Sequence, residues 1–343
     1  MIKPELISLF CGPGGMDEGF RQAGFATTLA YDIDSACVET FRFNHPQTKV
    51  QQADLSLLEA DAIVADWNQT SPDLSPVGVI GGPPCQSFSI SNVYQRDSDP
   101  RHLLLECYAR ILADLNNAFN LRFFVFENVP GLLAAKHIRR FERFTKMCED
   151  AGFRVFMNSL NAQDFGVAQI RKRVFVIGIN HKLYPSVEEF TFPTSTFEGP
   201  MHVRQVIEDL PEPAIFSRAL SPSDIPHHPN HWCMAPKSPK FTNGMLNSGK
   251  VVGRSFRVLG WDQPSSTIAY GHREVHIHPN MRRRLSIFEA MLLQGFPETY
   301  KLKGTLSDQI RLVSEAVSPP VAREIAKAIT EQLDIQMTLD VLS

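Results

Sequence analysis

The sequence of 343 residues lacks the patterns that mark metal-binding and disulfide-bonded proteins. Its cysteines form no CxxC pair, and no cluster of histidine and cysteine has the spacing of a zinc site. We therefore expect reduced thiols and no metal. The six cysteines are Cys11, Cys37, Cys85, Cys107, Cys148 and Cys233.

Long apolar runs are also missing. The stretch MIKPELISLF at the start has no apolar run long enough for a signal peptide, and no later stretch approaches a membrane span. With 43% hydrophobic and 21% charged residues, the composition is that of an ordinary globular protein. We expect a cytoplasmic monomer with no membrane partner, built as one large domain or as one large and one small domain.

An excess of positive charge, the usual mark of a nucleic-acid-binding protein, is absent as well, because the net charge is -3. The charge is uneven, however. The stretch KHIRRFERFTK (136–146) carries five basic side chains and one acid, and MRRRL adds Arg282, Arg283 and Arg284. Each run indicates either a solvated helix face or a contact with an anionic partner, and the composition leaves both open.

The first 180 residues alternate short apolar runs with amphipathic stretches. Strands are predicted at 6–10, 27–33, 50–54, 77–80, 123–129, 153–160 and 174–179, and helices at 16–23, 35–43, 103–118 and 138–151. This alternation predicts an α/β fold with a doubly wound, mixed but mostly parallel seven-stranded sheet. One of the last two strands is expected to be antiparallel, because no clear helix separates them.

Beyond residue 180 the pattern dissolves into a segment rich in proline and histidine. We expect a catalytic and cofactor-binding domain over 1–180 and a smaller, loop-rich domain over 181–265. Regular structure returns as predicted helices at 283–296 and 318–333. The last of these, within a C-terminal part over 266–343, is expected to return to the first domain.

The stretch GGPPCQSFS (81–89) places Cys85 on a stiff loop behind a predicted strand. Two glycines permit unusual backbone angles, and two prolines fix φ and remove amide donors, so we expect loop from Gly81 onward. The carboxyl ends of strands are where α/β proteins usually hold their active sites. The placement favours a functional cysteine, although a buried structural thiol explains a single cysteine equally well.

The stretch FCGPGGMDEGF (10–20) follows the first strand and opens the first helix. Gly12, Gly14 and Gly15 allow a ligand to approach the backbone at the positive end of that helix. Asp17 stands where the dinucleotide fingerprint has its third glycine, which argues against a nicotinamide cofactor. An ordinary tight turn without a ligand stays open as the alternative.

Two acids end the second and third strands. A carboxylate in the position of Asp32 commonly binds ribose hydroxyls, and Asp54 could accept a hydrogen bond from an adenine amino group. No basic clamp for phosphates accompanies them. The pattern therefore predicts a nucleoside ligand without a polyphosphate, and S-adenosylmethionine fits that description.

Polar residues also end the fifth predicted strand and begin the last one. Glu127 is costly to bury unless it is hydrogen-bonded or used, so it is a candidate general acid or anchor, with a helix cap as the alternative. Arg171 and Arg173 are two residues apart as they enter a strand, so both are expected on one face. Such a pair suits an anion or a polarised carbonyl, or else ion pairing at a sheet edge.

Together these motifs resemble the DNA (cytosine-5)-methyltransferases of bacterial restriction-modification systems. The resemblance runs from Ile7 to about Ile329, and the variable segment falls where that family keeps its target recognition domain. The motifs, in the family's order, are FCGPGG (10–15), YDID (31–34), AD (53–54), GGPPCQSFS (81–89), ENV (127–129), QIRKR (169–173), RRLSIFEAMLLQGFP (283–297) and AVSPPVAREIA (316–326).

The resemblance implies an enzyme that transfers a methyl group from S-adenosylmethionine to carbon 5 of a cytosine flipped out of double-stranded DNA. Cys85 would add to carbon 6, and Glu127 would hold the exocyclic amino group and ring nitrogen 3. Arg173, and less directly Arg171, would lie near the cytosine carbonyl oxygen and the DNA backbone.

The resemblance also implies binding residues. On the DNA side they are Gln86, Ser87, Ser89 and Asn128, the first three in a loop that runs to about Arg101 and would close over the base. On the cofactor side they are Phe10, Gly12, Pro13, Gly14, Asp32, Ile33, Asp54, Leu55, Pro83, Leu104 and Val317.

One position departs from the family. Before the Ser-Pro-Pro run the family usually has Gly-Asn, whereas this chain has Ser314 and Glu315, which puts one cofactor contact in doubt. We expect activity to survive, because the other motifs are intact. Three alternatives stay open: a tRNA cytosine-5 methyltransferase, a nicotinamide oxidoreductase, and a DNA-binding relative that has lost catalysis. The sequence gives neither the target DNA sequence nor proof of a cognate restriction endonuclease as a genetic partner.

Overall fold

The computed structural model describes residues 3–84, 103–195, 197–217, 219–249, 256–267 and 276–335. The chain divides into two compact units. Unit 1 comprises Met1–Leu160, Lys172–Pro193 and Val321–Ser343, and unit 2 comprises Asn161–Arg171 and Thr194–Pro320. Residues from Val321 onward therefore belong to the same unit as the N-terminal residues.

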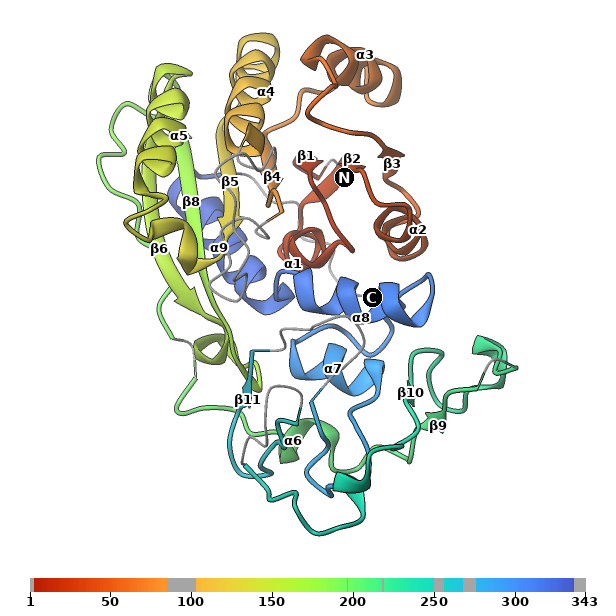
Figure 1. Cartoon of the computed structure of the whole chain (residues 1–343). Coiled ribbons are helices and arrows are strands. Elements are labelled where there is room, and N and C mark those ends of the chain that lie inside the picture. The colour runs from red at the N-terminus through yellow and green to blue at the C-terminus, as the bar shows by residue number, and fades with distance from the viewer. Residues whose placement is uncertain are drawn as a thin grey trace, which may run out of the picture. The chain divides into compact units, whose positions relative to one another are not determined.

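Unit 1 is built on a seven-stranded sheet with the strand order β3-β2-β1-β4-β5-β8-β6 (Figure 1). The strands are β1 (Glu5–Leu9), β2 (Ala26–Asp32), β3 (Lys49–Gln52), β4 (Gly78–Gly81), β5 (Phe123–Asn128), β6 (Phe153–Asn161) and β8 (Lys172–Asn180). Neighbouring strands from β3 to β5 pair in parallel, whereas β8 runs antiparallel to β5. The predicted sheet is confirmed, including a late antiparallel strand.

Helices cover both faces of this sheet (Figure 1). The helices grouped with unit 1 are α1 (Gly15–Gln22), α2 (Ser35–Asn44), α3 (Ala60–Thr70), α4 (Leu104–Phe119), α5 (Ile138–Asp150) and, from Val321 on, α9 (Pro319–Gln332). Strand β5 shows why two layers form, since successive side chains point to opposite faces. Phe123 stacks on Phe20 of α1, whereas Phe126 packs on Tyr108 of α4 and Phe144 of α5.

Two local predictions for unit 1 need correction. Helix α3 was not predicted, because its buried face consists only of Ala60, Ile63 and Trp67. Gly81 was predicted as loop but is the last residue of β4, where it pairs with both neighbouring strands. A Cβ atom on Gly81 would lie 2.1 Å from the Leu9 carbonyl oxygen, so this glycine allows the strands to approach.

In the described residues of unit 2 the regular elements are short. Strand β7 (Gln169–Ile170) pairs with β11 (Ser265–Ser266), and β9 (Ala214–Ile215) pairs with β10 (Trp232–Cys233). The α-helices described in this unit are α6 (Arg204–Ile207), α7 (Ile287–Leu293), α8 (Leu306–Glu315) and the first two residues of α9. Helix α7 is shorter than the predicted 283–296, because Ser286 caps its start, and α8 was not predicted.

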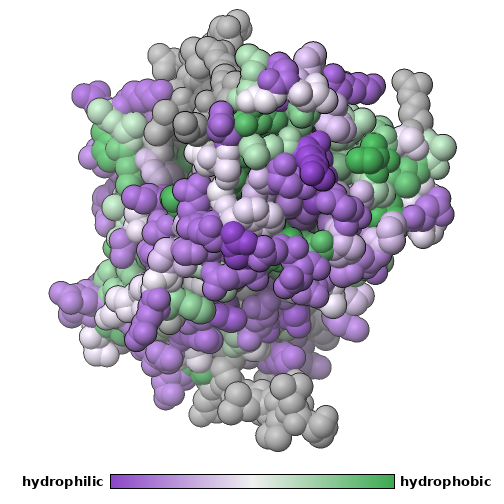
Figure 2. Space-filling view, turned by 90° about the horizontal axis from the view of Figure 1, so that it is seen from below, coloured by the Kyte–Doolittle hydropathy of each residue, from purple (hydrophilic) through white to green (hydrophobic). Residues whose placement is uncertain are grey.

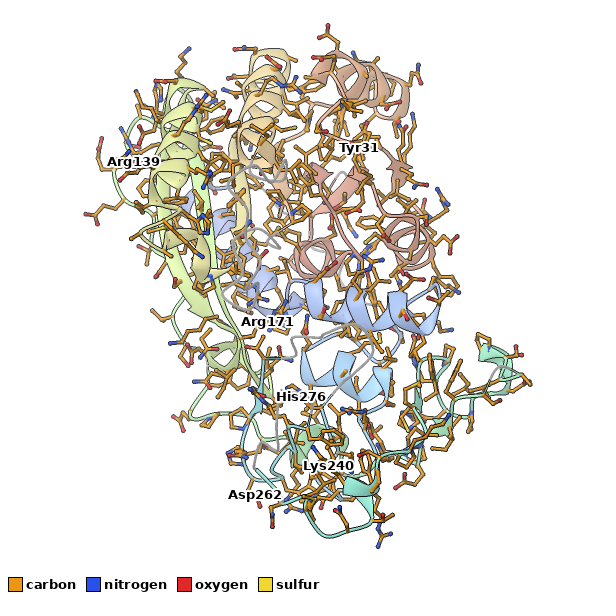
Figure 3. The ribbon with its side chains drawn as sticks, viewed as in Figure 1. Tyr31, Arg139, Arg171, Lys240, Asp262 and His276 are labelled. Atoms are coloured by element: carbon orange, nitrogen blue, oxygen red, sulfur yellow. The ribbon has the colours of Figure 1, made fainter. Side chains whose placement is uncertain are left out.

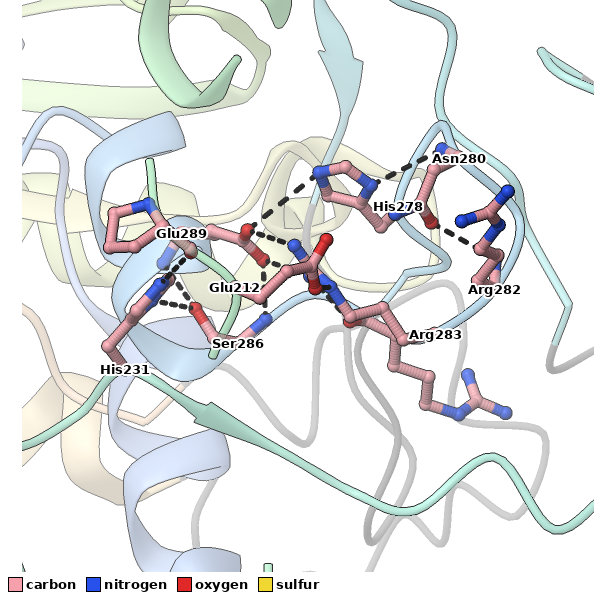
Figure 4. Close-up of polar contacts among 10 residues, drawn as sticks. Glu212, His231, His278, Asn280, Arg282, Arg283, Ser286 and Glu289 are labelled. Carbon is pink, nitrogen blue, oxygen red and sulfur yellow. Dashed lines mark hydrogen bonds and ion pairs between the residues drawn. The ribbon is translucent and has the colours of Figure 1, made fainter. Parts of the chain in front are cut away.

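A buried ionic cluster holds the start of α7 (Figure 4). The Arg283 guanidinium donates to both carboxylate oxygens of Glu289 at 2.9 Å, and its Nε donates to Glu212 at 2.7 Å. Glu289 is 0% exposed and also accepts the Ser286 amide at 2.7 Å. Bidentate bonding of this kind compensates the cost of burying the charges. Of the basic run 282–284, Arg283 and Arg284 are buried, which excludes for both the solvated helix face that was one of the two open alternatives.

In the described part of unit 2 four histidines are buried, His228, His231, His276 and His278. His231 lies 2.6 Å from the Pro211 carbonyl through Nε2 and 2.9 Å from the Ser286 hydroxyl through Nδ1. A carbonyl only accepts, so Nε2 carries the proton and Nδ1 accepts from Ser286 in the neutral ring. Burial lowers the pKa of all four rings, to about 4 for His228 and His276.

None of the helices that the structure describes has the length and apolar content needed to cross a bilayer. The face drawn in Figure 2 is largely hydrophilic, with small and separate apolar patches.

We predict that unit 2 loses stability as the pH falls from about 6.5 towards 4. The unfolded histidines bind protons near the ordinary pKa of 6.5, whereas burial holds the pKa of folded His228 and His276 near 4, so protons favour the unfolded state in this window. The free energy of unfolding should fall by roughly 1–2 kcal/mol for each of these two histidines by pH 5.

Urea unfolding followed by tryptophan fluorescence measures this loss. A Trp67→Phe variant leaves only Trp232 and Trp261, both in unit 2. His276→Gln should reduce the dependence on pH, and a matched change at the exposed His181 should not. A free energy of unfolding that stays constant from pH 7 to 5 would show that the histidines do not act in this way.

Candidate active site

The buried carboxylate of Glu127 lies at the carboxyl end of β5, 8% exposed. Arg173, near the start of the antiparallel β8, places its Nε 3.0 Å from Glu127 Oε1. Both side chains are largely shielded from water, where an ion pair is much stronger than at the surface. The predicted polar strand end therefore contains a carboxylate held by a guanidinium.

The backbone that leads to Cys85 lies against this carboxylate. A Cβ atom on Gly82 would lie 3.1 Å from Glu127 Oε2, so only a glycine leaves the present contact undisturbed. Asn128, 1% exposed, donates from its side-chain amide to the Pro83 carbonyl at 3.1 Å and accepts the Val129 amide at 2.9 Å. The two strand ends are thus joined just before the cysteine loop.

The loop itself was a central prediction, and it lies outside the described residues. Cys85, Gln86, Ser87 and Ser89 all belong to this stretch, so their roles stay predictions. Asn128, predicted on the DNA side, has its side-chain amide bonded within the protein. The contribution of Gly82 was not foreseen, because the sequence shows a glycine but not which side chain packs over it.

The glycine turn after β1 has backbone angles that favour glycine. Gly12 and Gly14 have φ of 55° and 90°, and Phe10 has φ of 53°, which is rare for a residue with a side chain. A Cβ atom on Gly12 would meet nothing within 4 Å, so open space adjoins the turn. Pro13 follows within the same turn, which ends at the start of α1.

Asp32, at the end of β2, fixes this turn. Its Oδ2 accepts the Gly12 amide at 2.8 Å, and its Oδ1 accepts the Asp34 amide at 2.9 Å. The next residue, Ile33, is 57% exposed, which is unusual for a large apolar side chain after a buried strand. At this strand end the Asp32 carboxylate orders the backbone, and the next residue, Ile33, exposes an apolar side chain.

The remaining predicted cofactor residues of unit 1 follow neighbouring elements. Asp54 accepts the Ser56 amide at 2.9 Å, and Leu55 is buried with its carbonyl 2.9 Å from the Cys107 sulfur. Leu104 is partly exposed at the first residue of α4. Because β3, β2 and β1 are adjacent and parallel, the residues that follow them share one edge of the sheet. Pro83, after β4, follows the next strand at the same edge.

The two arginines of the QIRKR motif differ in their surroundings. Only Arg173 lies in β8, while Arg171 precedes it, so the strand alternation from which a shared face was expected does not apply to the pair. Arg171 belongs to unit 2, is 2% exposed and donates to the carbonyls of Ser314 and Ala316, each at 2.8 Å. Val317, the other predicted site residue in unit 2, is 9% exposed.

No group of three or more histidine, cysteine, aspartate or glutamate side chains that could hold a metal ion occurs in the part of the chain that the structure describes.

Sequence comparison supplies the family. The profile of C-5 cytosine-specific DNA methylases matches residues 5–331, which is nearly the whole chain. The chain belongs to this family. It is a DNA (cytosine-5)-methyltransferase, its substrate is DNA, and its reaction requires a methyl donor.

Individual relatives agree with this assignment. The Type II methyltransferase M.FnuDI of Fusobacterium nucleatum is 33% identical and aligns with 96% of this chain and 95% of its own length. The Type II methyltransferase M.MthTI of Methanothermobacter thermautotrophicus is 32% identical, with coverages of 96% and 98%.

A solved structure supports the fold of this methyltransferase. It is that of a protein from an Escherichia coli prophage, described as a DNA modification methyltransferase, with a TM-score of 0.75 at 23% identity. It covers 96% of this chain and 99% of its own chain. The mostly parallel seven-stranded sheet is therefore the methyltransferase fold.

We predict that Gly82→Ala lowers the turnover number of the methyltransferase about 10- to 100-fold with a small effect on stability, because an added Cβ displaces the Glu127 carboxylate. Methyl transfer to duplex DNA and urea unfolding measure the two effects. The matched change Gly81→Ala should instead destabilise the fold by more than about 3 kcal/mol, since its Cβ would meet a backbone carbonyl. Full activity of a folded Gly82→Ala enzyme would contradict the placement of Glu127.

Proposed function

We propose that this enzyme transfers a methyl group from S-adenosylmethionine to carbon 5 of a cytosine flipped out of duplex DNA, through a covalent adduct with Cys85. The observation that carries the proposal is the Glu127–Arg173 pair at 3.0 Å, packed beside the Gly82–Pro83 backbone that leads to the cysteine.

A nucleophile is needed because carbon 5 of cytosine is unreactive towards a methyl donor. Addition of the Cys85 thiolate to carbon 6 turns the ring into an enamine, whose carbon 5 then attacks the methyl group. Loss of the proton on carbon 5 and expulsion of the thiolate restore the aromatic ring and the free cysteine. Covalent catalysis replaces one difficult step by easier ones.

We assign Glu127 to the edge of the flipped base. In the proposal its carboxyl group binds the exocyclic amino group and ring nitrogen 3, which favours protonation of that nitrogen as the adduct forms. Arg173 holds the carboxylate through Oε1 and supplies positive charge near the cytosine carbonyl oxygen. Both roles need the base outside the helix, which costs a few kcal/mol of unstacking.

The glycine turn fits an adenosyl ligand. The Gly12 amide of the turn is held in place by Asp32, the space beside Gly12 is open, and Ile33 offers an exposed apolar surface. We assign the cofactor to these residues and to the other residues predicted for it in unit 1, which are Phe10, Pro13, Gly14, Asp54, Leu55, Pro83 and Leu104. When bound, S-adenosylmethionine supplies an electrophilic methyl group. Val317 is assigned to the same cofactor on its sequence motif alone.

Contacts with DNA phosphates are less clearly marked. The basic run 136–146 forms most of α5, and Figure 3 draws Arg139 on this helix. Two of its cations have acidic partners, Arg143 with Glu106 at 3.3 Å and Lys146 with Asp150 at 2.7 Å. These pairs favour a solvated helix face, so we do not assign the run to DNA.

The biological setting follows from the relatives. Type II methyltransferases are the names that the similar proteins carry, and we propose that this enzyme likewise protects a specific duplex sequence within a restriction-modification system. The profile match and these names favour DNA over tRNA as the substrate.

We predict that Cys85→Ser abolishes methyl transfer to duplex DNA and leaves the dissociation constant for S-adenosylmethionine unchanged. Incubation with cofactor and duplex DNA that contains 5-fluorocytosine at its target should produce a covalent complex with the natural enzyme and none with the variant, since fluorine blocks loss of the group on carbon 5. Bisulfite sequencing of DNA from cells that express the enzyme identifies the target for this substrate. A tRNA substrate serves as the comparison, and methylation of tRNA in place of DNA would refute the proposal.

A further inference from the structure

The guanidinium of Arg171 lies at the carboxyl end of α8. Its Nη2 donates to the carbonyl of Ser314, in the last turn of the helix, and to that of Ala316, the C-cap residue, each at 2.8 Å. The last carbonyls of a helix have no partner within the helix and form its negative end. A buried cation that donates to two of these carbonyls stabilises the helix end through charge-assisted bonds.

A second side chain holds the same stretch of backbone. Gln294, 0% exposed, donates its amide to the Ala316 carbonyl at 2.7 Å. The Ser318 hydroxyl returns a hydrogen bond to the Gln294 carbonyl at 2.8 Å. Three hydrogen bonds from Arg171 and Gln294 therefore hold the carbonyls of Ser314 and Ala316. A fourth, from the Ser318 hydroxyl to the Gln294 carbonyl, holds the end of this segment.

Close packing fixes the residues that follow. Gly295 has φ of 87°, and a Cβ atom there would lie 2.8 Å from the ring of Pro320. Residues of three motifs that lie far apart in the sequence, QIRKR, LLQGFP and SEAVSPP, thus meet around one segment of backbone.

The side chains of Ser314 and Glu315, which stand where the family usually has Gly-Asn, both contact Arg311. The Ser314 hydroxyl donates to the Arg311 carbonyl one turn earlier at 2.8 Å, and Glu315 pairs with Arg311 at 3.5 Å. The second pair is partly exposed, where ion pairs contribute little to stability. The conformation of 314–318 is therefore set through backbone carbonyls, which are the same for Ser-Glu as for Gly-Asn.

We propose that Arg171 is a positioning residue for the cofactor rather than a contact to the base. It holds the carbonyls of Ser314 and Ala316 and thereby fixes Val317, which the proposed function assigns to S-adenosylmethionine. The same arrangement explains how the chain accepts Ser314 and Glu315 where the family usually has Gly-Asn. The inference rests on the proposed function and corrects the catalytic role first predicted for Arg171.

Steady-state kinetics of Arg171→Lys and the matched Arg173→Lys test the assignment. Lysine keeps the charge but loses the planar fork of donors. We expect Arg171→Lys to raise KM for S-adenosylmethionine about tenfold with kcat changed less than about twofold, which corresponds to about 1.4 kcal/mol of cofactor binding. Arg173→Lys should do the reverse and lower kcat about tenfold or more with KM for the cofactor nearly constant.

Trapping on 5-fluorocytosine DNA counts the active enzyme and separates positioning from partial unfolding. A purely structural role would lower the trapped fraction and leave KM unchanged. A lower kcat per trapped Arg171→Lys enzyme with an unchanged KM for the cofactor would overturn the inference. If the natural enzyme transfers no methyl group, the proposed function fails, whereas an active natural enzyme with the wrong kinetic split refutes only the role of Arg171.

A second variant tests the backbone argument. Glu315→Asn restores the usual family residue and should change the calorimetric dissociation constant for S-adenosylmethionine by less than about twofold, since the segment is held through its carbonyls. Glu315→Ala should behave alike. A cofactor that binds about tenfold more tightly to Glu315→Asn would show that the side chain, and not the backbone, decides the contact.

Discussion

The burial of one carboxylate determines much of unit 1. Glu127 is buried near the end of β5 beside a guanidinium that balances its charge, and Arg173 supplies this group from β8, which runs antiparallel to β5. A parallel strand at this position would begin at the opposite edge of the sheet. The reversed direction of β8 therefore brings its first residues to the edge where the other strands end.

The sequence predicted the sheet well because its central strands β1, β4 and β5 are buried on both faces and the strand ends carry conspicuous residues. Gly12 and Asp32 were singled out from single strand ends, and the structure joins them by a hydrogen bond. Such local signals survive folding, since a positive φ or a strand end is decided by few neighbours. The roles of Cys85 and its loop depend on residues outside the described part of the chain and remain predictions.

Contacts between distant segments could not be predicted in the same way. Arg171 and Arg173 look equivalent in the sequence, and only the residue at which β8 begins separates a contact to backbone carbonyls from a contact to Glu127. The basic run 282–284 has no feature that reveals its burial, because the acids that pair with Arg283 are Glu289 and Glu212, the latter 71 residues away. Helix α8 was missed although Thr305 and Asp308 form a capping box, a signal that the pattern of apolar residues obscured.

The ionic cluster around Glu289 determines which parts of the unit 2 sequence can vary in evolution. Its described regular elements are short, and a single helix start gathers contacts from Arg283, Glu212 and the neighbourhood of His231. Loops that do not take part in this cluster are free to exchange residues or vary in length without disturbing it. Loop mutation of this kind is how the target recognition domain predicted over 181–265 would acquire a new DNA target, with α7 and its ionic contacts unchanged.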